Sequence, residues 1–180
     1  GIKISDDGLS VLKTLDSLES ISLSGCKING SGLKYISKNT TIKIIRLSGT
    51  GIVDENLSNL SELTNLEMLD LIETNLSGEG FKYLSRLTNL KDLNLNRSPI
   101  TDEGLKYLIN CKKMERLFLS GTKITDKSVP YVIAIYQGQE THSLFIEIYG
   151  TKISRKGVKE LKKAGIEVNC DYKDLSSNLP

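Results

Sequence analysis

The chain has 180 residues, of which 38% are hydrophobic and 26% charged, and its formal net charge is +2 at pH 7. This charge is too close to neutral to argue by itself for nucleic acid or an anionic membrane, and we expect neither as a partner. No apolar run approaches the roughly 18 residues that a membrane-spanning helix needs. The three cysteines, Cys26, Cys111 and Cys170, are far apart and form no CxxC pair. Such a sparse, odd set favours a reducing, cytoplasmic compartment over a disulfide-rich secreted domain.

The first residues match the middle of a unit that recurs along the chain. The segment Lys3-Ile4-Ser5-Asp6-Asp7-Gly8-Leu9 has the pattern of the later units but lacks a strand before it. We therefore expect a fragment of a longer protein, and a natural N-terminal cap helix is the alternative.

Complete units begin 24 residues apart, at Leu18, Ile42, Leu66, Leu90 and Met114. The repeated positions of the third unit are Leu66, Leu69, Leu71, Thr74, Leu76, Phe81, Leu84 and Leu87. Their first part alternates as in a strand, and their last part has helical spacing. Each unit is therefore predicted to be one strand followed by one helix.

Short polar segments mark the ends of these elements. A Ser or Thr near acidic residues precedes several helices, as in Ser77-Gly78-Glu79 and Thr101-Asp102-Glu103. Such a hydroxyl can cap the free amides of the first turn, and the acids suit the helix dipole. The dipeptides Thr64-Asn65 and Thr88-Asn89 are typical of a turn back to the next strand.

The last units depart from the regular spacing. In the fifth unit Pro130 disfavours a helical conformation at Val129, so we expect the helix to start late, near Pro130. The sixth unit, with Ile146 and Ile148, lies 29 residues after the fifth, and the five extra residues fall within 136–142. A closing strand over 166–170 completes a single domain at 1–170, and 171–180 is predicted to be a C-terminal tail.

One unit cannot fold alone. About eight buried side chains gain about 1.5–3 kcal/mol each, whereas ordering each residue of the backbone costs about 1–2 kcal/mol. Neighbouring units must therefore share one core. Parallel strands stack at about 4.8 Å but helices need about 10 Å, so the stack curves. The predicted fold is an α/β right-handed solenoid, or horseshoe, with a parallel sheet on the concave side and helices on the convex side.

The repeats resemble the leucine-rich repeat family, over about residues 2 to 170. The segment Ile100-Thr101-Asp102-Glu103-Gly104-Leu105 is similar to the I-T-D-x-G-L repeats of its ribonuclease-inhibitor-like and cysteine-containing branches. Cys26 keeps the usual Cys of one position, which Thr50, Thr74, Thr122 and Thr151 otherwise occupy. Members of that branch are recognition parts of ubiquitin ligases, enzyme inhibitors and bacterial effectors, so a secreted effector acting in a host cytosol is the alternative location.

The sequence offers no constellation for catalysis. His142 is the single histidine and has no second His or Cys near it in sequence, so we interpret it as an exposed side chain rather than a metal ligand or base. Cys26 and Cys111 fit turn and core packing, while Cys170 is less clear. The Lys-rich segment 152–163 fits a solvated helix face, with an anionic polymer as the alternative. We expect no enzyme activity, no metal and no cofactor.

The outward positions of the strands carry the candidate site. Exposed apolar and aromatic residues interleaved with charges are typical of a protein interface. The predicted partner-binding residues are Ile44, Arg46, Met68, Asp70, Ile72, Asp92, Asn94, Arg116, Phe118, Phe145, Glu147 and Tyr149. Two alternatives stay open: strands favour such residues anyway, or a missing part of the protein covers them.

The predicted function is therefore protein binding through the concave face, with no oligomeric state implied. The alternative is a recognition arm for a larger catalytic, ubiquitin-ligase or effector protein whose catalytic part lies outside this chain. Seven strands at about 4.8 Å, about 15 Å wide, offer about 430 Å², against about 800 Å² per partner in a standard interface. The rims of the sheet or the segment 136–142 would have to add area.

Overall fold

The computed structural model describes residues 4–172 and contains one seven-stranded parallel sheet, in the order β1 to β7. The strands are β1 Ser20–Ser22, β2 Ile44–Arg46, β3 Met68–Asp70, β4 Asp92–Asn94, β5 Arg116–Phe118, β6 Phe145–Glu147 and β7 Glu167–Asn169. Leu69, Leu93 and Leu117 are direct partners in adjacent strands. The predicted register, with one strand per unit and a closing strand, is confirmed.

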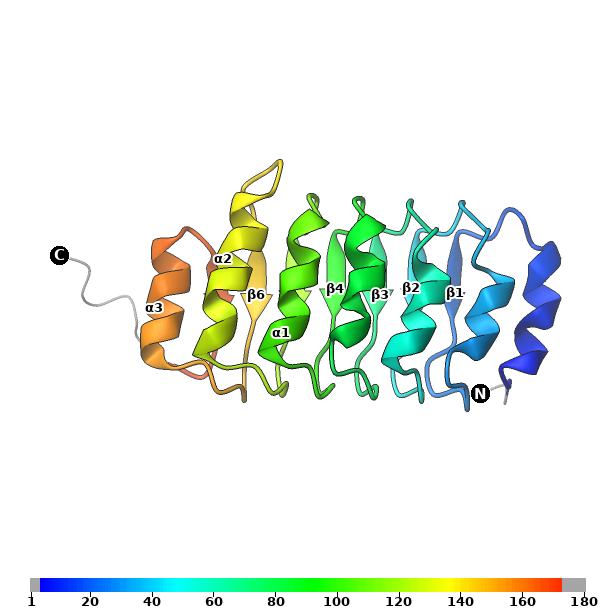
Figure 1. Ribbon diagram of the computed structural model, residues 1–180, viewed down its shortest axis with the longest axis horizontal. Coiled ribbons are helices and arrows are strands. Elements are labelled where there is room, and N and C mark those ends of the chain that lie inside the picture. Colours follow the sequence, from blue (N-terminus) through cyan, green and yellow to red (C-terminus); the bar gives the residue numbers. More distant parts are fainter. Residues whose placement is uncertain (1–3, 173–180) are drawn as a thin grey trace.

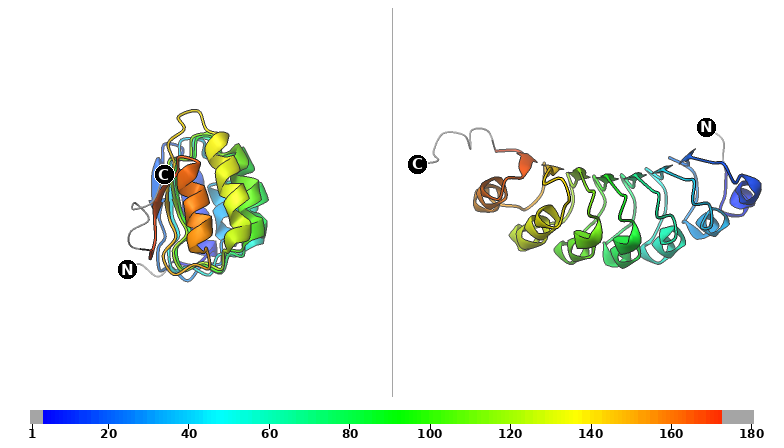
Figure 2. Two further views of the ribbon diagram at one scale, coloured as in Figure 1. Left: turned by 90° about the vertical axis from the view of Figure 1, so that its left-hand side faces the viewer. Right: turned by 90° about the horizontal axis from the view of Figure 1, so that it is seen from above.

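The strands alternate along the chain with helical segments that form the opposite layer. These segments are η1 Asp7–Thr14, η2 Ser31–Tyr35, η3 Asp54–Leu60, η4 Glu79–Arg86, α1 Asp102–Leu105, η5 Lys106–Asn110, η6 Asp126–Ser128, α2 Val129–Gln137 and α3 Arg155–Lys163, where η denotes a 3-10 helix. Seen from above, the units form an arc with the sheet on its inner side and the helices on its outer side (Figure 2). The predicted curved solenoid is therefore the observed fold (Figure 1).

The kind of helix was not evident from the sequence. Most of the outer segments up to Asn110 are 3-10 helices, and the longer α-helices α2 and α3 come last. The buried positions Phe81, Leu84 and Leu87 are three residues apart, which matches the three residues per turn of a 3-10 helix. However, Val129, Val132 and Ile135 have the same spacing in α2, so spacing alone does not distinguish the two kinds of helix.

The core is one continuous cluster that runs the length of the solenoid. The repeated leucines of the third and fourth units are completely buried, as the pattern predicts. The threonines that replace the usual Asn or Cys are also buried, and each donates its hydroxyl proton to a carbonyl three residues earlier. In Thr50 and Thr122 these Oγ1–O distances are 2.6 and 2.7 Å. A buried hydroxyl satisfied in this way does not carry the cost of a lost hydrogen bond.

The helix starts are capped both across units and locally. The prediction of local Ser and Thr caps holds for Thr125 but not for Thr101. The carboxylate of Asp54 accepts hydrogen bonds from the next unit: the Ser77 amide and hydroxyl at 2.9 and 2.8 Å, and the amides of Gly78 and Gly80 at 3.1 and 2.8 Å. Asp6 likewise accepts from three amides of the next unit, those of Asn29, Gly30 and Gly32. Asp102 and Asp126 each accept from the amide and hydroxyl of a single residue, Thr125 and Ser154 respectively. Thr125 and Ser154 cap their own helices through the side chain, and the Ser77 hydroxyl accepts from the amide of Glu79, the first residue of η4, at 3.5 Å.

Glycine allows this close contact. A Cβ atom on Gly80 would lie 2.4 Å from the carbonyl oxygen of Asp54, and one on Gly32 would lie 2.4 Å from that of Asp6. Both contacts are with backbone, which cannot move aside as a side chain could. The glycine of each such pair therefore lets one coil lie directly on the coil before it.

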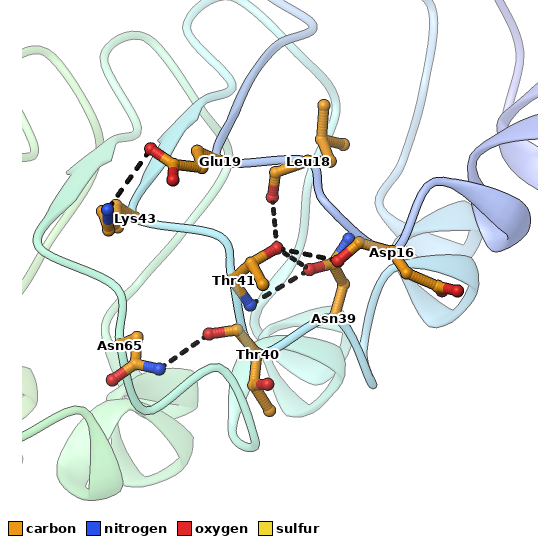
Figure 3. Close-up of polar contacts among 8 residues, drawn as sticks. All are labelled: Asp16, Leu18, Glu19, Asn39, Thr40, Thr41, Lys43 and Asn65. Atoms are coloured by element: carbon orange, nitrogen blue, oxygen red, sulfur yellow. Dashed lines mark hydrogen bonds and ion pairs between the residues drawn. The ribbon is translucent and has the colours of Figure 1, made fainter.

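Side-chain amides and hydroxyls join the turns before the strands (Figure 3). Asn39 donates from Nδ2 to the carbonyl oxygen of Leu15 at 2.6 Å, and Asn65 donates likewise to Thr40 at 2.7 Å. Thr41 donates from Oγ1 to the carbonyl oxygen of Leu18 at 2.9 Å. The predicted turns thus also connect each unit to the one before it, so backbone groups between strands are satisfied.

In the irregular fifth unit the α-helix starts late, near Pro130, as predicted, but Val129 is helical, so the expectation that Pro130 disfavours this conformation there was wrong. The 3-10 turn η6 comes first, and α2 begins at Val129 with Pro130 in its first turn. The loop after α2 holds exposed His142 and buried Gln139, whose Nε2 donates to the carbonyl of Met114. Of the predicted tail 171–180, residues 173–180 lie outside the described part of the chain, so the domain bounds stay a prediction.

Candidate functional site

The inner face of the sheet is built from the first and third residues of each short strand. In β2, β3, β4 and β6 the middle residue is buried and its two neighbours are half-buried. Parallel pairing places Ile44, Met68 and Asp92 in one row, which continues to Arg116 and Phe145. A second row runs parallel to it and contains Arg46, Asp70, Asn94, Phe118 and Glu147.

The two remaining predicted residues, Ile72 and Tyr149, lie just beyond β3 and β6. Their carbonyls accept hydrogen bonds from Gly49 and Gly121 of the preceding units, at 2.8 and 2.7 Å. These hydrogen bonds continue the contact between adjacent units one step past the ends of the strands. All twelve predicted positions therefore lie along one side of the sheet.

The apolar side chains of this face are less exposed than the sequence suggested. Tyr149 counts as exposed, with 37% of its surface accessible, whereas Ile44, Met68, Ile72, Phe118 and Phe145 are already half-buried. Strands that stack about 4.8 Å apart shield the flanks of each other's side chains. The expected exposure is therefore only partial for these five residues, each of which keeps part of its surface open to solvent.

A shallow depression of about 200 Å³ occupies the centre of the inner face. We call it the central depression, and its lining residues are Met68, Leu69, Asp70, Asp92, Asn94, Arg116 and Phe118. Arg116 pairs with Asp92 through two hydrogen bonds, and the one from Nη2 to Oδ2 is 2.6 Å long. This hydrogen bond and the charge of Asp92 raise the pKa of Arg116 above its ordinary value.

Phe118 connects the central depression to the next strand. Its ring meets that of Phe145 edge-on, with 5.9 Å between the centroids and 61° between the planes. An edge-to-face pair is a favourable geometry for two aromatic rings. The two rings form an apolar surface beside the Asp92–Arg116 ion pair, and such a mixture is what protein interfaces use.

A polar network lies beyond the phenylalanines. Glu147 accepts at Oε1 from Ser120 Oγ at 2.9 Å and from Asn96 Nδ2 at 3.3 Å. The Ser120 amide in turn donates to Asn96 Oδ1 at 2.7 Å. The sequence places Asn96 and Ser120 on the outward side of their strands but gave no reason to single them out. The structure shows that they hold the Glu147 carboxylate in place.

Alternating charges border the face on the side where the strands begin. The positions just before the strands hold Glu19, Lys43, Glu67, Lys91 and Glu115. Ion pairs join Lys43 to Glu19 at 3.2 Å and Lys91 to Glu67 at 2.7 Å. The hydrogen bond and charge of Lys91 lower the pKa of Glu67 below its ordinary value. This alternation was visible once the units were aligned, but sequence reasoning overlooked it.

The residues considered for catalysis lie apart from this face. His142 is exposed in the loop after α2, where its ring meets that of Tyr136 edge-on at 6.0 Å. Cys111 is buried in the core, and burial raises its pKa to about 12, which disfavours the nucleophilic thiolate. Residues 4–172 hold no cluster of three His, Cys, Asp or Glu side chains that could bind a metal ion. Over the same range, none of the helices is both long and apolar enough to cross a bilayer.

Sequence comparison identifies the repeats. The profile described as "Leucine Rich repeat" matches residues 14–37 and 86–108. No curated protein matches the chain. The two matched segments lie in different parts of the solenoid, and each follows the repeated pattern of apolar positions described above.

Similar solved structures include two internalins of Listeria monocytogenes. The internalin inlF is 16% identical, with a TM-score of 0.63 over 96% of this chain and 52% of that one, so this chain spans about half of its length. Internalin C2 (inlC2) is 20% identical, with a TM-score of 0.61 over 94% and 76% of the two chains. A TDR receptor is 16% identical, with a TM-score of 0.61 over 89% and 27%.

Identities this low show the fold alone. The same architecture nevertheless recurs in these structures, with one parallel sheet and an outer layer of helices. The matched repeats and the fold together support the leucine-rich repeat family for this chain, while its ribonuclease-inhibitor-like subtype stays a prediction.

Proposed function

We propose that this chain is a protein-binding module whose partner lies on the inner face of the sheet. Leucine-rich repeats are in general protein-interaction modules, so the family supports binding but does not identify the surface. The observation that carries the proposal is the central depression, which holds an Asp–Arg ion pair and Phe118, one ring of the aromatic pair, on a face that the core does not use.

The residue types of this surface suit a binding site. Arg and aromatic residues are enriched among the side chains that contribute most to protein association. Here Arg116 and Phe118 come from one strand, whose middle residue, Leu117, is anchored in the core. Because the strand is held by neighbours on both sides, these groups are ordered before a partner arrives, which reduces the entropy lost on binding.

The limited width of the sheet means that a partner must also touch its borders. The strands have three residues each, and about 430 Å² of inner face is about half of a standard contribution to an interface. The ion pairs of the charged border and the Arg97–Glu73 pair at 2.7 Å on the opposite border offer polar rims. An apolar centre with a polar rim is the usual organisation of such interfaces.

The experiment compares inner-face variants with a convex control. Phe118→Ala, Arg116→Gln and Tyr149→Ala each remove one inner-face group, and Lys82→Glu changes an exposed residue of η4 on the outer layer. Each purified variant is used to capture partners from an extract of the organism that makes the protein, after a thermal melt has shown that it is folded. We expect at least one partner to be lost with the three inner-face variants and kept with Lys82→Glu. Equal capture by all four would contradict the proposal.

A further inference from the structure

Charge is distributed unevenly between the two sides of the solenoid. Strand β1 presents only serines, Ser20 and Ser22, to the inner face. From β3 onward that face holds the acidic residues Asp70, Asp92, Glu147 and Glu167, with Arg116 as the only base on these strands. The chain as a whole is nevertheless slightly positive, at +2. With Arg46 of β2 counted as well, four acids and two bases lie on the strands of the inner face, which is therefore acidic although the chain as a whole is not.

The charges of Asp92 and Arg116 cancel, which leaves Asp70 as the excess charge of the central depression. The Oδ1 atom of Asp70 accepts a hydrogen bond from the Ile72 amide at 3.1 Å. Its register partner, Arg46, directs Nη2 to the sulfur of Met68 at 3.8 Å instead. Within residues 4–172, Asp70 forms no ion pair, so this half-buried carboxylate has no cation of its own.

Phe118 lies in the same depression as this carboxylate. A carboxylate attracts a guanidinium or ammonium group through charge-assisted hydrogen bonds, and an aromatic face attracts the same cations. The volume, about 200 Å³, is below the about 300–1,000 Å³ of small-molecule sites. It suits a single long side chain from a larger partner. Arg116 does not oppose this cation strongly, because Asp92 neutralises it.

We propose that the partner presents a basic segment and places one Arg or Lys side chain in the central depression, between Asp70 and Phe118. This inference rests on the proposed function, since it specifies the chemistry of the partner at that same face. Further basic residues of the segment would lie along β6 and β7, toward Glu147 and Glu167, both of which point to the inner side.

The repeats supply a closely matched variant for the test. In the next unit Asn94 occupies the position of Asp70, and its Oδ1 accepts from the Asn96 amide at 3.1 Å, the same distance as in the Asp70 contact. Asp70→Asn should therefore keep the local hydrogen bond and the fold while it removes the charge. Glu79→Gln, at an exposed acid of η4 on the outer layer, raises the net charge by the same single unit and is the control for that change.

The probe is a random peptide library displayed on phage and selected on the full chain. Enriched peptides are synthesised, and their dissociation constants are measured for the wild type, Asp70→Asn, Phe118→Ala and Glu79→Gln. We expect the peptides to contain Arg or Lys, and their affinity to fall about tenfold or more with Asp70→Asn, a loss of about 1.4 kcal/mol. A peptide with that Arg or Lys replaced by norleucine should bind wild type and Asp70→Asn equally.

The possible results separate this inference from the proposed function. Peptides that need Phe118 but are neutral or acidic, or that bind Asp70→Asn as tightly as the wild type, would overturn the basic partner and leave concave-face binding intact. Peptides that are insensitive to both inner-face variants, or a selection with no enrichment over the Phe118→Ala protein, would count against both.

Discussion

Replacing Asp54 by alanine tests whether a carboxylate shared between two coils is a main source of their coupling. Asp54 opens η3 and accepts four hydrogen bonds from Ser77, Gly78 and Gly80 of the next unit. The substitution removes the acceptor but leaves these donors, and Gly78 and Gly80 are buried residues. The cost therefore falls on the contact between two units rather than on the stability of one helix.

The expected loss follows from those donors. A buried donor left without a partner costs about 1–3 kcal/mol, and replacing an N-terminal cap by alanine costs about 0.5–2 kcal/mol. The substitution leaves two buried amides without an acceptor, and water can replace part of it because Asp54 is only half-buried. We therefore expect the free energy of unfolding to fall by about 2–4 kcal/mol. With a urea m-value of about 2 kcal/mol/M, the unfolding midpoint should fall by about 1–2 M.

Equilibrium urea unfolding followed by circular dichroism measures this change. The matched control is Glu55→Ala, an exposed acid in the same first turn of η3. Asp102→Ala should be intermediate, because Asp102 accepts only from the amide and hydroxyl of Thr125. If Asp54→Ala and Glu55→Ala agreed within about 0.5 kcal/mol, the typical range of a neutral surface change, the coupling argument would be refuted.

Three further outcomes follow from the structure. Gly80→Ala should lower the urea midpoint clearly, because its Cβ would lie 2.4 Å from the carbonyl oxygen of Asp54; an unchanged midpoint would contradict that contact. Burial raises the pKa of Cys111 to about 12, so this thiol should resist iodoacetamide at pH 8 until the protein unfolds. Labelling is followed by mass spectrometry, and a rate as fast as that of half-buried Cys170 would contradict the burial of Cys111. Burial alone would raise the pKa of Asp6, but the hydrogen bonds from backbone amides outweigh it and lower this pKa below 3.8. The ionised carboxylate therefore stabilises the fold above about pH 4, and this contribution is lost as the pH falls further. Thermal melts between pH 2 and pH 6 should show a weaker acid dependence in Asp6→Asn than in the wild type.

The sequence predicted the register of the fold because burial is strictly periodic. Leu69, Leu93 and Leu117 are each fully buried and each occupy the middle of a strand. A shift of one residue in any unit would turn its leucine toward solvent, so the apolar pattern alone determines which residues pair. The same reasoning correctly predicted the closing strand.

The contacts between units could not be read from a single unit. Asp54 looks like a local helix-start residue, yet its hydrogen-bond partners lie 23 to 26 residues later. A signal does exist when the units are aligned: Asp6 precedes Gly30, and Asp54 precedes Gly78, at the same position of successive units. Local cap rules assign such an acid to its own helix, so the contacts of Asp54 with the next unit were not predicted.

On the inner face the sequence predicted which residues lie there but not which of their side chains contact one another. The pairing of Asp92 with Arg116 was accessible, because these opposite charges lie one repeat apart in the same row of the sheet. The contact of Asn96 with Glu147 was not, since these residues are 51 apart and the irregular loop after α2 intervenes. Neither exposure nor the central depression follows from periodicity, because both depend on how neighbouring side chains of different size fill the face.

The variation among inner-face residues bears on whether strand formation alone explains them. Strand β1 has serine on both sides of Ile21 and still pairs in register with β2, so this sheet does not require large or aromatic side chains on its inner face. The Phe118–Phe145 pair, in contrast, is found in a part of the sheet where pairing is equally regular. β-propensity therefore gives no reason for the rings to be on β5 and β6 rather than β1. Recognition of a partner at the central depression does give one, and it also accounts for the acidic residues that surround them.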